Sequence, residues 1–324
     1  MTDVIDSGRR SAAATASSRR EPGILRRALD SDLFHSFKRS KLVVLAAILT
    51  ICMLSAALLA PLIAPYNPYD LGSLNLLDSN LPPAWLKEGD PRFLFGTDDQ
   101  GRDILSTILY GTRSSMAISL LAVLMAIVMG VSLGLAAGYL GGYVDSVIMR
   151  VADVMLTFPT ILIALLVNGI AMTAFKGRIS GGGQFWILVC SIGFSFWVQY
   201  ARTVRSMTLV EKNKEYVQAA RLIGLSRAAI MFKHVLPNVL SPVLVIATIN
   251  LALAIITEAT LSFLGVGLPP SEPSLGTMIQ IGNRYLFSGS WWMVAFPGIT
   301  LAVLVLAVNL LGDWLRDALN PKLR

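Results

Sequence analysis

Six long apolar stretches without a charged side chain follow one another along the chain, and each exceeds the roughly 20 residues that a helix needs to cross a bilayer core. They are Leu42–Ala64, Ser114–Val144, Val154–Phe175, Ile179–Ala201, Leu236–Thr257 and Tyr285–Gly312. None shows the period-2 alternation of an outer-membrane barrel. The pattern predicts an all-α polytopic membrane protein with six transmembrane helices.

The composition agrees with this interpretation and excludes an ordinary soluble protein. Apolar residues make up 54% of the chain and charged residues 15%, against roughly 25% charged residues in soluble domains. The mean hydropathy is +0.64. Both cysteines, Cys52 and Cys190, lie inside apolar stretches, which indicates small core residues rather than a metal site or a disulfide.

The basic residues are distributed unevenly between the two sides of the membrane. Six spans place both termini on one side, and that side carries 20 of the 27 lysines and arginines. The positive-inside rule therefore predicts cytoplasmic termini for a protein of the bacterial inner membrane. Topology also explains the net charge of +7, so no nucleic-acid partner is expected.

The predicted spans divide the chain into four parts. Residues 1–40 form a cytoplasmic tail, which ends in an amphipathic interfacial helix or a plain linker over Ile24–Arg39; we favour the helix. Residues 41–113 hold the first span and a proline-rich external loop. Residues 114–315 form a five-helix core, and residues 316–324 form a second cytoplasmic tail.

Acidic residues near the span ends are assigned to local structure. Asp98 or Asp99 is expected to cap a short external helix over Asp103–Tyr110. Asp153 lies near the end of a span and is expected to pair with Arg150, three residues earlier on the same helix face.

Two features inside the spans need an explanation. Glu258 is the only carboxylate deep in a span, where a charge costs about 2.5–3.5 kcal/mol on insertion scales. A structural hydrogen-bonding role is favoured for it over a role in permeation. The glycines Gly130, Gly134 and Gly138 recur every four residues and predict a face on which another helix packs closely.

Motifs for catalysis are missing from the sequence. There is no GxxxxGK[ST] segment to hold phosphates and no nucleophile elbow. The two histidines, His35 and His234, are too far apart for a zinc-protease motif. We therefore expect no catalytic residue, no metal ligand and no cofactor bound by this chain.

The longest cytoplasmic loop, residues 202–237, predicts two short helices separated by a glycine. The first covers Lys214–Ile223 and ends at Gly224; the second covers Ser226–His234 and ends before Pro237. One face of the first helix is expected to present Tyr216, Ala219, Ala220 and Ile223. A basic loop of this kind could bind anionic lipid, but its small alanine pair is suited to docking in a protein groove.

This loop resembles the EAA loop of ABC-importer permeases. Gln218-Ala219-Ala220 is followed after three residues by Gly224, and Leu236-Pro237 closes the pattern at the family's spacing, although Gln218 and His234 depart from the usual residues. Glu215-Tyr216, ahead of the alanine pair, resembles the dipeptide, oligopeptide and nickel branch of this family. Four other segments resemble the same branch: FGTDDQGRD (Phe95–Asp103), GYLGGYVDSVIMRVAD (Gly138–Asp153), EATLSFLGVGLPP (Glu258–Pro270) and NLLGDWLRDALNP (Asn309–Pro321). Within that branch the chain is similar to the second of two permease subunits.

The resemblance implies a type I ABC-importer permease fold and a place in a larger complex. In this family a permease pairs with a homologous second permease, and two cytoplasmic ATPase subunits bind ATP and Mg²⁺. A periplasmic or lipid-anchored binding protein delivers the solute, and membrane lipids surround the spans. The residues that the resemblance implies for coupling to the ATPase are Glu215, Tyr216, Ala219, Ala220, Gly224 and Leu225.

Polar side chains in the spans are candidates for the translocation path. They are Asn168, Asn250, Thr257 and Glu258, although each could instead bond a neighbouring helix. The solute is left open among dipeptides, longer peptides, nickel chelates and glutathione-like or opine-like compounds. An ion-gradient-driven secondary transporter is the alternative function; mid-span charge pairs and an inverted repeat would support it, and neither is evident.

Overall fold

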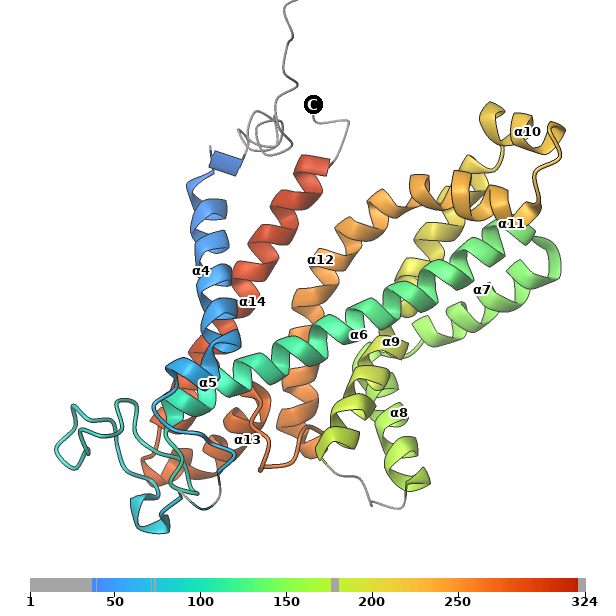
Figure 1. The fold of residues 1–324 in the computed structure, drawn as a ribbon. Coiled ribbons are helices and arrows are strands. Elements are labelled where there is room, and N and C mark those ends of the chain that lie inside the picture. Colours follow the sequence, from blue (N-terminus) through green and yellow to red (C-terminus); the bar gives the residue numbers. More distant parts are fainter. Residues whose placement is uncertain (1–36, 39, 71, 73, 176–180, 320–324) are drawn as a thin grey trace, which may run out of the picture. The chain divides into compact units, whose positions relative to one another are not determined.

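The computed structural model describes residues 37–38, 40–70, 72, 74–175 and 181–319 (Figure 1). The chain forms two units, Met1–Lys41 and Leu42–Arg324. The interfacial helix expected over Ile24–Arg39 lies outside the described residues, except for Phe37 and Lys38, which are helical. The structure below is that of the second unit.

Five of the described helices are long and apolar enough to cross a membrane. They are α4 (Lys41–Leu58), α6 (Ile104–Leu140), α9 (Gly181–Glu211), α12 (Leu236–Leu261) and α14 (Trp292–Leu319). The pair α7 (Gly142–Leu156) and α8 (Thr160–Ala174) meets the same criterion when the two helices are taken together, and they meet at a bend of 101°. With this pair counted as one span, the six-span all-α prediction is confirmed.

Shorter elements connect these helices. They are α5 (Ala60–Ile63), α10 (Glu215–Leu222), α11 (Arg227–Ile230), α13 (Leu275–Tyr285), the 3-10 turns η1 (Leu76–Asp78) and η4 (Leu286–Ser288), and the π-helical turns η2 (Met231–Val235) and η3 (Ser262–Val266). In the described part of the chain, extended pairing is limited to an isolated bridge between Thr97 and Asp103.

A proline causes the bend in the third predicted span, Val154–Phe175. Pro159 disfavours helical backbone at the preceding Phe158, and Pro159 itself is extended, with ψ of 135°. The predicted span is therefore divided between the last turn of α7 and the whole of α8.

Ion pairs join α7 to α9. Arg205 of α9 binds the carboxylate of Asp145, with Nη2 2.7 Å from Oδ2. Asp153 likewise pairs with Arg202 of α9. The predicted pairing of Asp153 with Arg150 is wrong, because a partner from the neighbouring helix takes the carboxylate.

The second span begins earlier than its hydrophobic pattern predicts. Asp103 caps α6, and its carboxylate accepts hydrogen bonds from the Ser106 amide at 2.8 Å and the Ser106 hydroxyl at 2.6 Å. The cap expected at Asp98 or Asp99 is therefore wrong. Helix α6 then runs without interruption through Arg113, a charged residue at which the pattern predicted a boundary.

Helices α6 and α9 pack closely along the glycine face of α6. A Cβ atom at Gly130 would lie 2.4 Å from Cβ of Tyr200, and one at Gly134 would lie 2.4 Å from the Ala201 carbonyl oxygen. One at Gly138 would lie 2.7 Å from Cβ of Thr208. These distances are too short for any side chain, so the packing predicted from the glycine spacing is confirmed.

We expect the substitution Gly134→Ala to destabilise the protein by about 1–3 kcal/mol, because the methyl group must push α9 away from α6. The matched control is Gly169→Ala in α8, where no heavy atom lies within 4 Å of the added Cβ. Thermal unfolding of the purified protein should show a lower melting temperature for the first variant only. Equal melting temperatures would contradict the tight packing.

A helical path begins at Arg227 and runs through α11, η2, α12 and the start of η3, and it ends at a kink at Gly265, which has φ of +84°. Pro237 has no amide hydrogen, and the chain passes it with the π-helical turn η2, in which Leu236 N–H donates to the Met231 carbonyl. The predicted end of the second short helix before Pro237 is therefore wrong. The α10–α11 segment, defined here as residues 212–235, is directly continuous with α12 (Figure 1).

Two apolar clusters hold the helices together. The larger one joins α6, α9 and α12 and includes Val217 of α10 and Ile230 of α11. The second joins the start of α6 to α12, α13 and α14, with Leu275 and Trp292 among its buried members. The α10–α11 segment is thus packed on the same core as the spans.

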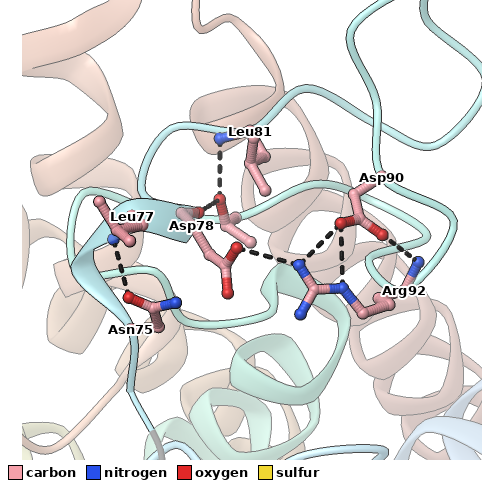
Figure 2. Close-up of polar contacts among 7 residues, drawn as sticks. Asn75, Leu77, Asp78, Leu81, Asp90 and Arg92 are labelled. Carbon is pink, nitrogen blue, oxygen red and sulfur yellow. Dashed lines mark hydrogen bonds and ion pairs between the residues drawn. The ribbon is translucent and has the colours of Figure 1, made fainter.

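The loop between α5 and α6 is held by two arginines that differ in burial. Arg92 lies between two aspartates on the surface, with Nη2 3.0 Å from Asp78 and 2.7 Å from Asp90 (Figure 2). Arg102 and Asp98 form a buried pair, with Nε 2.6 Å from Oδ2 and side chains only 3% and 9% exposed. Arg102 also donates to the Pro270 carbonyl at 2.6 Å, which ties the loop to the segment before α13.

Candidate functional site

The turn after α10 has a conformation that favours glycine. Gly224 has φ of +82°, its N–H donates to the Arg221 carbonyl at 3.0 Å, and the Leu225 N–H donates to the Ala220 carbonyl at 3.2 Å. These two bonds form a Schellman motif, in which the left-handed residue ends the helix. Ser226 then caps α11 by accepting from the Ala229 amide at 3.2 Å. The predicted roles of glycine and serine in ending and starting these helices are confirmed.

The faces of α10 differ from the predicted ones. Val217 and Ala220 are buried against the core, whereas Ala219 and Ile223 are exposed. The expectation that Tyr216, both alanines and Ile223 share one face is therefore wrong: Ala220 packs inward while Ala219 faces outward. Leu222 and Ile223, 90% and 78% exposed, extend the apolar surface next to Ala219. Exposure of large apolar side chains to water does not stabilise an isolated chain, so this surface suits a protein partner.

A polar network fixes α10 to the end of α9. The Tyr216 hydroxyl donates to Glu211 and accepts from the Asn238 amide at 3.0 Å. Lys214 Nζ lies 2.8 Å from the other oxygen of Glu211. Partial burial of the hydroxyl, followed by its hydrogen bond to Glu211 and the charge of that carboxylate, raises the pKa of Tyr216 to about 12, so the phenol stays protonated and remains a donor.

We expect Tyr216→Phe to loosen α10, because the buried Glu211 carboxylate loses one of its two donors at a cost of about 1 kcal/mol. Hydrogen exchange of the α10 amides should become faster in this variant. Tyr143→Phe is the control, since Tyr143 is 85% exposed. Unchanged exchange in α10 for both variants would contradict an anchoring role.

The other coupling candidates lie on the outside of this segment. Glu215 is exposed in the first turn of α10, where a carboxylate interacts favourably with the helix dipole. Leu225 is 42% exposed beside the Gly224 turn. The sequence pattern did not single out Glu211 or Asn238, because α9 continues to Glu211 through a stretch predicted to be a loop.

The four path candidates are all buried, but no hydrogen bond joins any two of them in the described structure. Asn168 donates to the Val266 carbonyl at 3.3 Å. Thr257 donates to the Leu253 carbonyl of its own helix at 2.8 Å. Asn250 is 1% exposed, and its amide nitrogen has no partner among the described residues. A role in solute passage stays a prediction for each.

Glu258 is fully buried in a group of serines. Ser262 donates to its Oε1 at 2.7 Å, and Ser274 lies 3.4 Å from Ser262. Through these contacts the carboxyl group connects α12, η3 and the cap of α13. The geometry agrees with the favoured structural role, while Oε2 has no partner in the described part of the chain.

Gln184 is a buried polar residue that the sequence pattern did not single out. Its Nε2 donates to the Val266 carbonyl at 3.1 Å, and the same oxygen accepts a hydrogen bond from the Asn168 side-chain amide. Both amides therefore meet at the end of η3. The position of this glutamine near the start of an apolar stretch was the sequence signal that could have indicated a buried polar residue.

Comparison with known proteins identifies the family. Residues 126–324 match the family described as binding-protein-dependent transport system inner membrane component, and residues 31–83 match the N-terminal TM domain of oligopeptide transport permease C. The chain is 43% identical to the dipeptide transport system permease protein DppC of Escherichia coli K12, over 90% of this chain and 93% of that protein. It is 36% identical to the di/tripeptide transport system permease protein DppC of Pseudomonas aeruginosa UCBPP-PA14, over 90% and 92%.

A solved structure supports the fold. A chain of the MetNI methionine ABC transporter, in an inward-facing conformation, aligns with a TM-score of 0.51 at 20% identity, covering 67% of this chain and 98% of that chain. This likeness confirms the predicted type I ABC-importer permease fold. The chain therefore belongs to the family of inner membrane components of binding-protein-dependent transport systems, as a multi-pass permease of the DppC/OppC type.

Proposed function

We propose that this permease imports di- or oligopeptides as one of two homologous permease subunits in an ATP-driven complex. The similarity to dipeptide and di/tripeptide permeases, over about nine-tenths of the chain, supports the peptide class. Two cytoplasmic ATPase subunits bind and hydrolyse ATP with Mg²⁺, and a periplasmic or lipid-anchored binding protein delivers the peptide. Family membership argues against the alternative of an ion-gradient-driven secondary transporter.

The permease itself is non-catalytic in this proposal, and its termini are cytoplasmic. The observation that carries the coupling role is the α10–α11 segment, which presents Ala219, Leu222 and Ile223 outward while Val217 and Ala220 fasten it to the core. A partner that moves α10 therefore moves a body continuous with α12. Glu215, Tyr216, Ala219, Ala220, Gly224 and Leu225 are the proposed coupling residues, and Asn168, Asn250, Thr257 and Glu258 are the proposed path residues.

Co-purification followed by reconstitution tests this function. A tagged chain should bring down a second permease and two ATPase subunits from the membrane. The complex in liposomes should accumulate labelled dipeptide only when ATP and the binding protein are both present. Uptake by the chain alone, driven by an ion gradient, would contradict the proposal.

A further inference from the structure

A hollow beside the α10–α11 segment is rich in hydrogen-bond donors. It has a volume of about 460 Å³ and is lined by Tyr139, Leu140, Arg221, Leu225, Arg227 and Ile230. The first two residues end α6, and the others come from α10, the Gly224 turn and α11. The lining side chains supply two guanidinium groups and a phenol but no carboxylate, so the hollow suits an anion.

The two arginines are available for a ligand. Neither Arg221 nor Arg227 forms an ion pair with a carboxylate in the described structure, in contrast to Arg202 and Arg205 of α9. The guanidinium carbon of Arg221 lies 5.8 Å from the centre of the buried Tyr139 ring. This cation–π contact orients Arg221 over the end of α6 without neutralising its charge.

The hollow lies where a membrane span ends. Leu140 is the last residue of an uncharged apolar run in α6 that begins at Ser114. Tyrosines at such ends lie at the level of lipid headgroups. Leu140, which lines the hollow, is 55% exposed and can contact acyl chains. In the proposed topology this end faces the cytoplasmic leaflet, which carries anionic lipids.

We propose that this hollow binds the phosphate group of an anionic phospholipid, with Arg221 and Arg227 as its charged ligands. A bound phosphate bridges the end of α6 to both short helices of the α10–α11 segment. It therefore holds that segment in place relative to the spans. We expect a regulatory consequence: the solute-stimulated ATPase rate should rise with the anionic lipid content of the bilayer. This consequence rests on the proposed coupling function, whereas the lipid binding itself does not.

Native mass spectrometry of the purified complex, titrated with phosphatidylglycerol, tests the binding. Arg221→Gln with Arg227→Gln should weaken the retention of one phosphatidylglycerol molecule about 30-fold, at about 1 kcal/mol for each basic residue near a membrane surface. Lys233→Gln with Arg316→Gln removes two exposed charges outside the hollow and should leave this binding unchanged. If the first variant does not assemble, Arg227→Gln alone should weaken binding about fivefold.

Three results would overturn the proposal. Equal binding of phosphatidylglycerol by the wild type and the arginine variants would show that the hollow is not the lipid site. Displacement of the lipid by inorganic phosphate at equal concentration would assign the hollow to a soluble anion. Loss of the ATPase subunits from the arginine variants, with unchanged lipid binding, would assign it to an ATPase side chain. Because binding is measured without ATP turnover, failure of the coupling function leaves this test intact.

Discussion

Gly224→Val should lower the rate of solute-stimulated ATP hydrolysis in the reconstituted complex by at least about tenfold. Gly224 has φ of +82°, a conformation that costs a residue with a side chain roughly 1–2 kcal/mol. The cost comes from the backbone alone, because a Cβ atom at this position would meet no heavy atom within 4 Å. A β-branched residue therefore changes the turn, which redirects Leu225 and α11 and displaces the surface that the ATPase is proposed to grip.

Two controls separate uncoupling from general strain. Gly224→Asn should keep most of the activity, because asparagine tolerates the left-handed region. Gly289→Val introduces comparable strain at a residue with φ of +94° and open space around it, in the turn before α14. That variant should lose stability but keep its stimulated ATPase rate per assembled complex. Normal stimulated hydrolysis by Gly224→Val would count heavily against the coupling role.

Asp98→Ala should lower the free energy of unfolding by about 3–5 kcal/mol, because it leaves the buried guanidinium of Arg102 without its counter-charge. The carboxylate also accepts the backbone amides of Gln100 and Arg102 at 2.9 and 2.8 Å. Asp98→Asn can keep these two contacts through its Oδ1 but loses both the charge and the Oδ2 acceptor for Arg102 Nε, so it should fall between the wild type and Asp98→Ala. Thermal unfolding of the purified complex measures the series.

The same loop contains a control for this prediction. Asp90→Ala breaks the exposed contact with Arg92 (Figure 2), and water can replace the lost partner. Its melting temperature should stay close to that of the wild type. If both aspartate variants lost stability equally, burial would not be the property that makes the Asp98–Arg102 pair important.

Long uncharged apolar stretches predicted the spans well, because a bilayer imposes a length and an apolar content that a sequence shows directly. The stripe of Gly130, Gly134 and Gly138 likewise predicted a close contact, since the absence of side chains is itself the physical cause of the approach. The Gly224 turn followed from the same reasoning about backbone freedom. Features determined by one helix and its immediate neighbours were thus accessible from the sequence.

Features that depend on which residue of another element lies nearby were not accessible. The partner of Asp153 was misassigned because an arginine on another helix competes with the one a turn away. The cap of α6 was misplaced because the pairing of Asp98 with Arg102 depends on the Pro270 segment, far away in the chain. The outward face of α10 was misjudged because helical spacing alone cannot tell which side the α6–α9–α12 core covers. The coupling and path residues remain predictions that need functional measurement.

The helical path of residues 227–264, which ends at the kink at Gly265, can transmit motion along its length. This path is about 57 Å long at the usual helical rise of roughly 1.5 Å per residue. A tilt of about 5° at the α11 end thus displaces the far end by about 5 Å, as long as the π-helical turns do not absorb it. Val266 lies just beyond that far end, on the other side of the Gly265 kink, and its carbonyl accepts hydrogen bonds from the side-chain amides of Asn168 and Gln184. We therefore expect a movement of α10 to reach the kink at Gly265 and to disturb these two partly buried hydrogen bonds beside it.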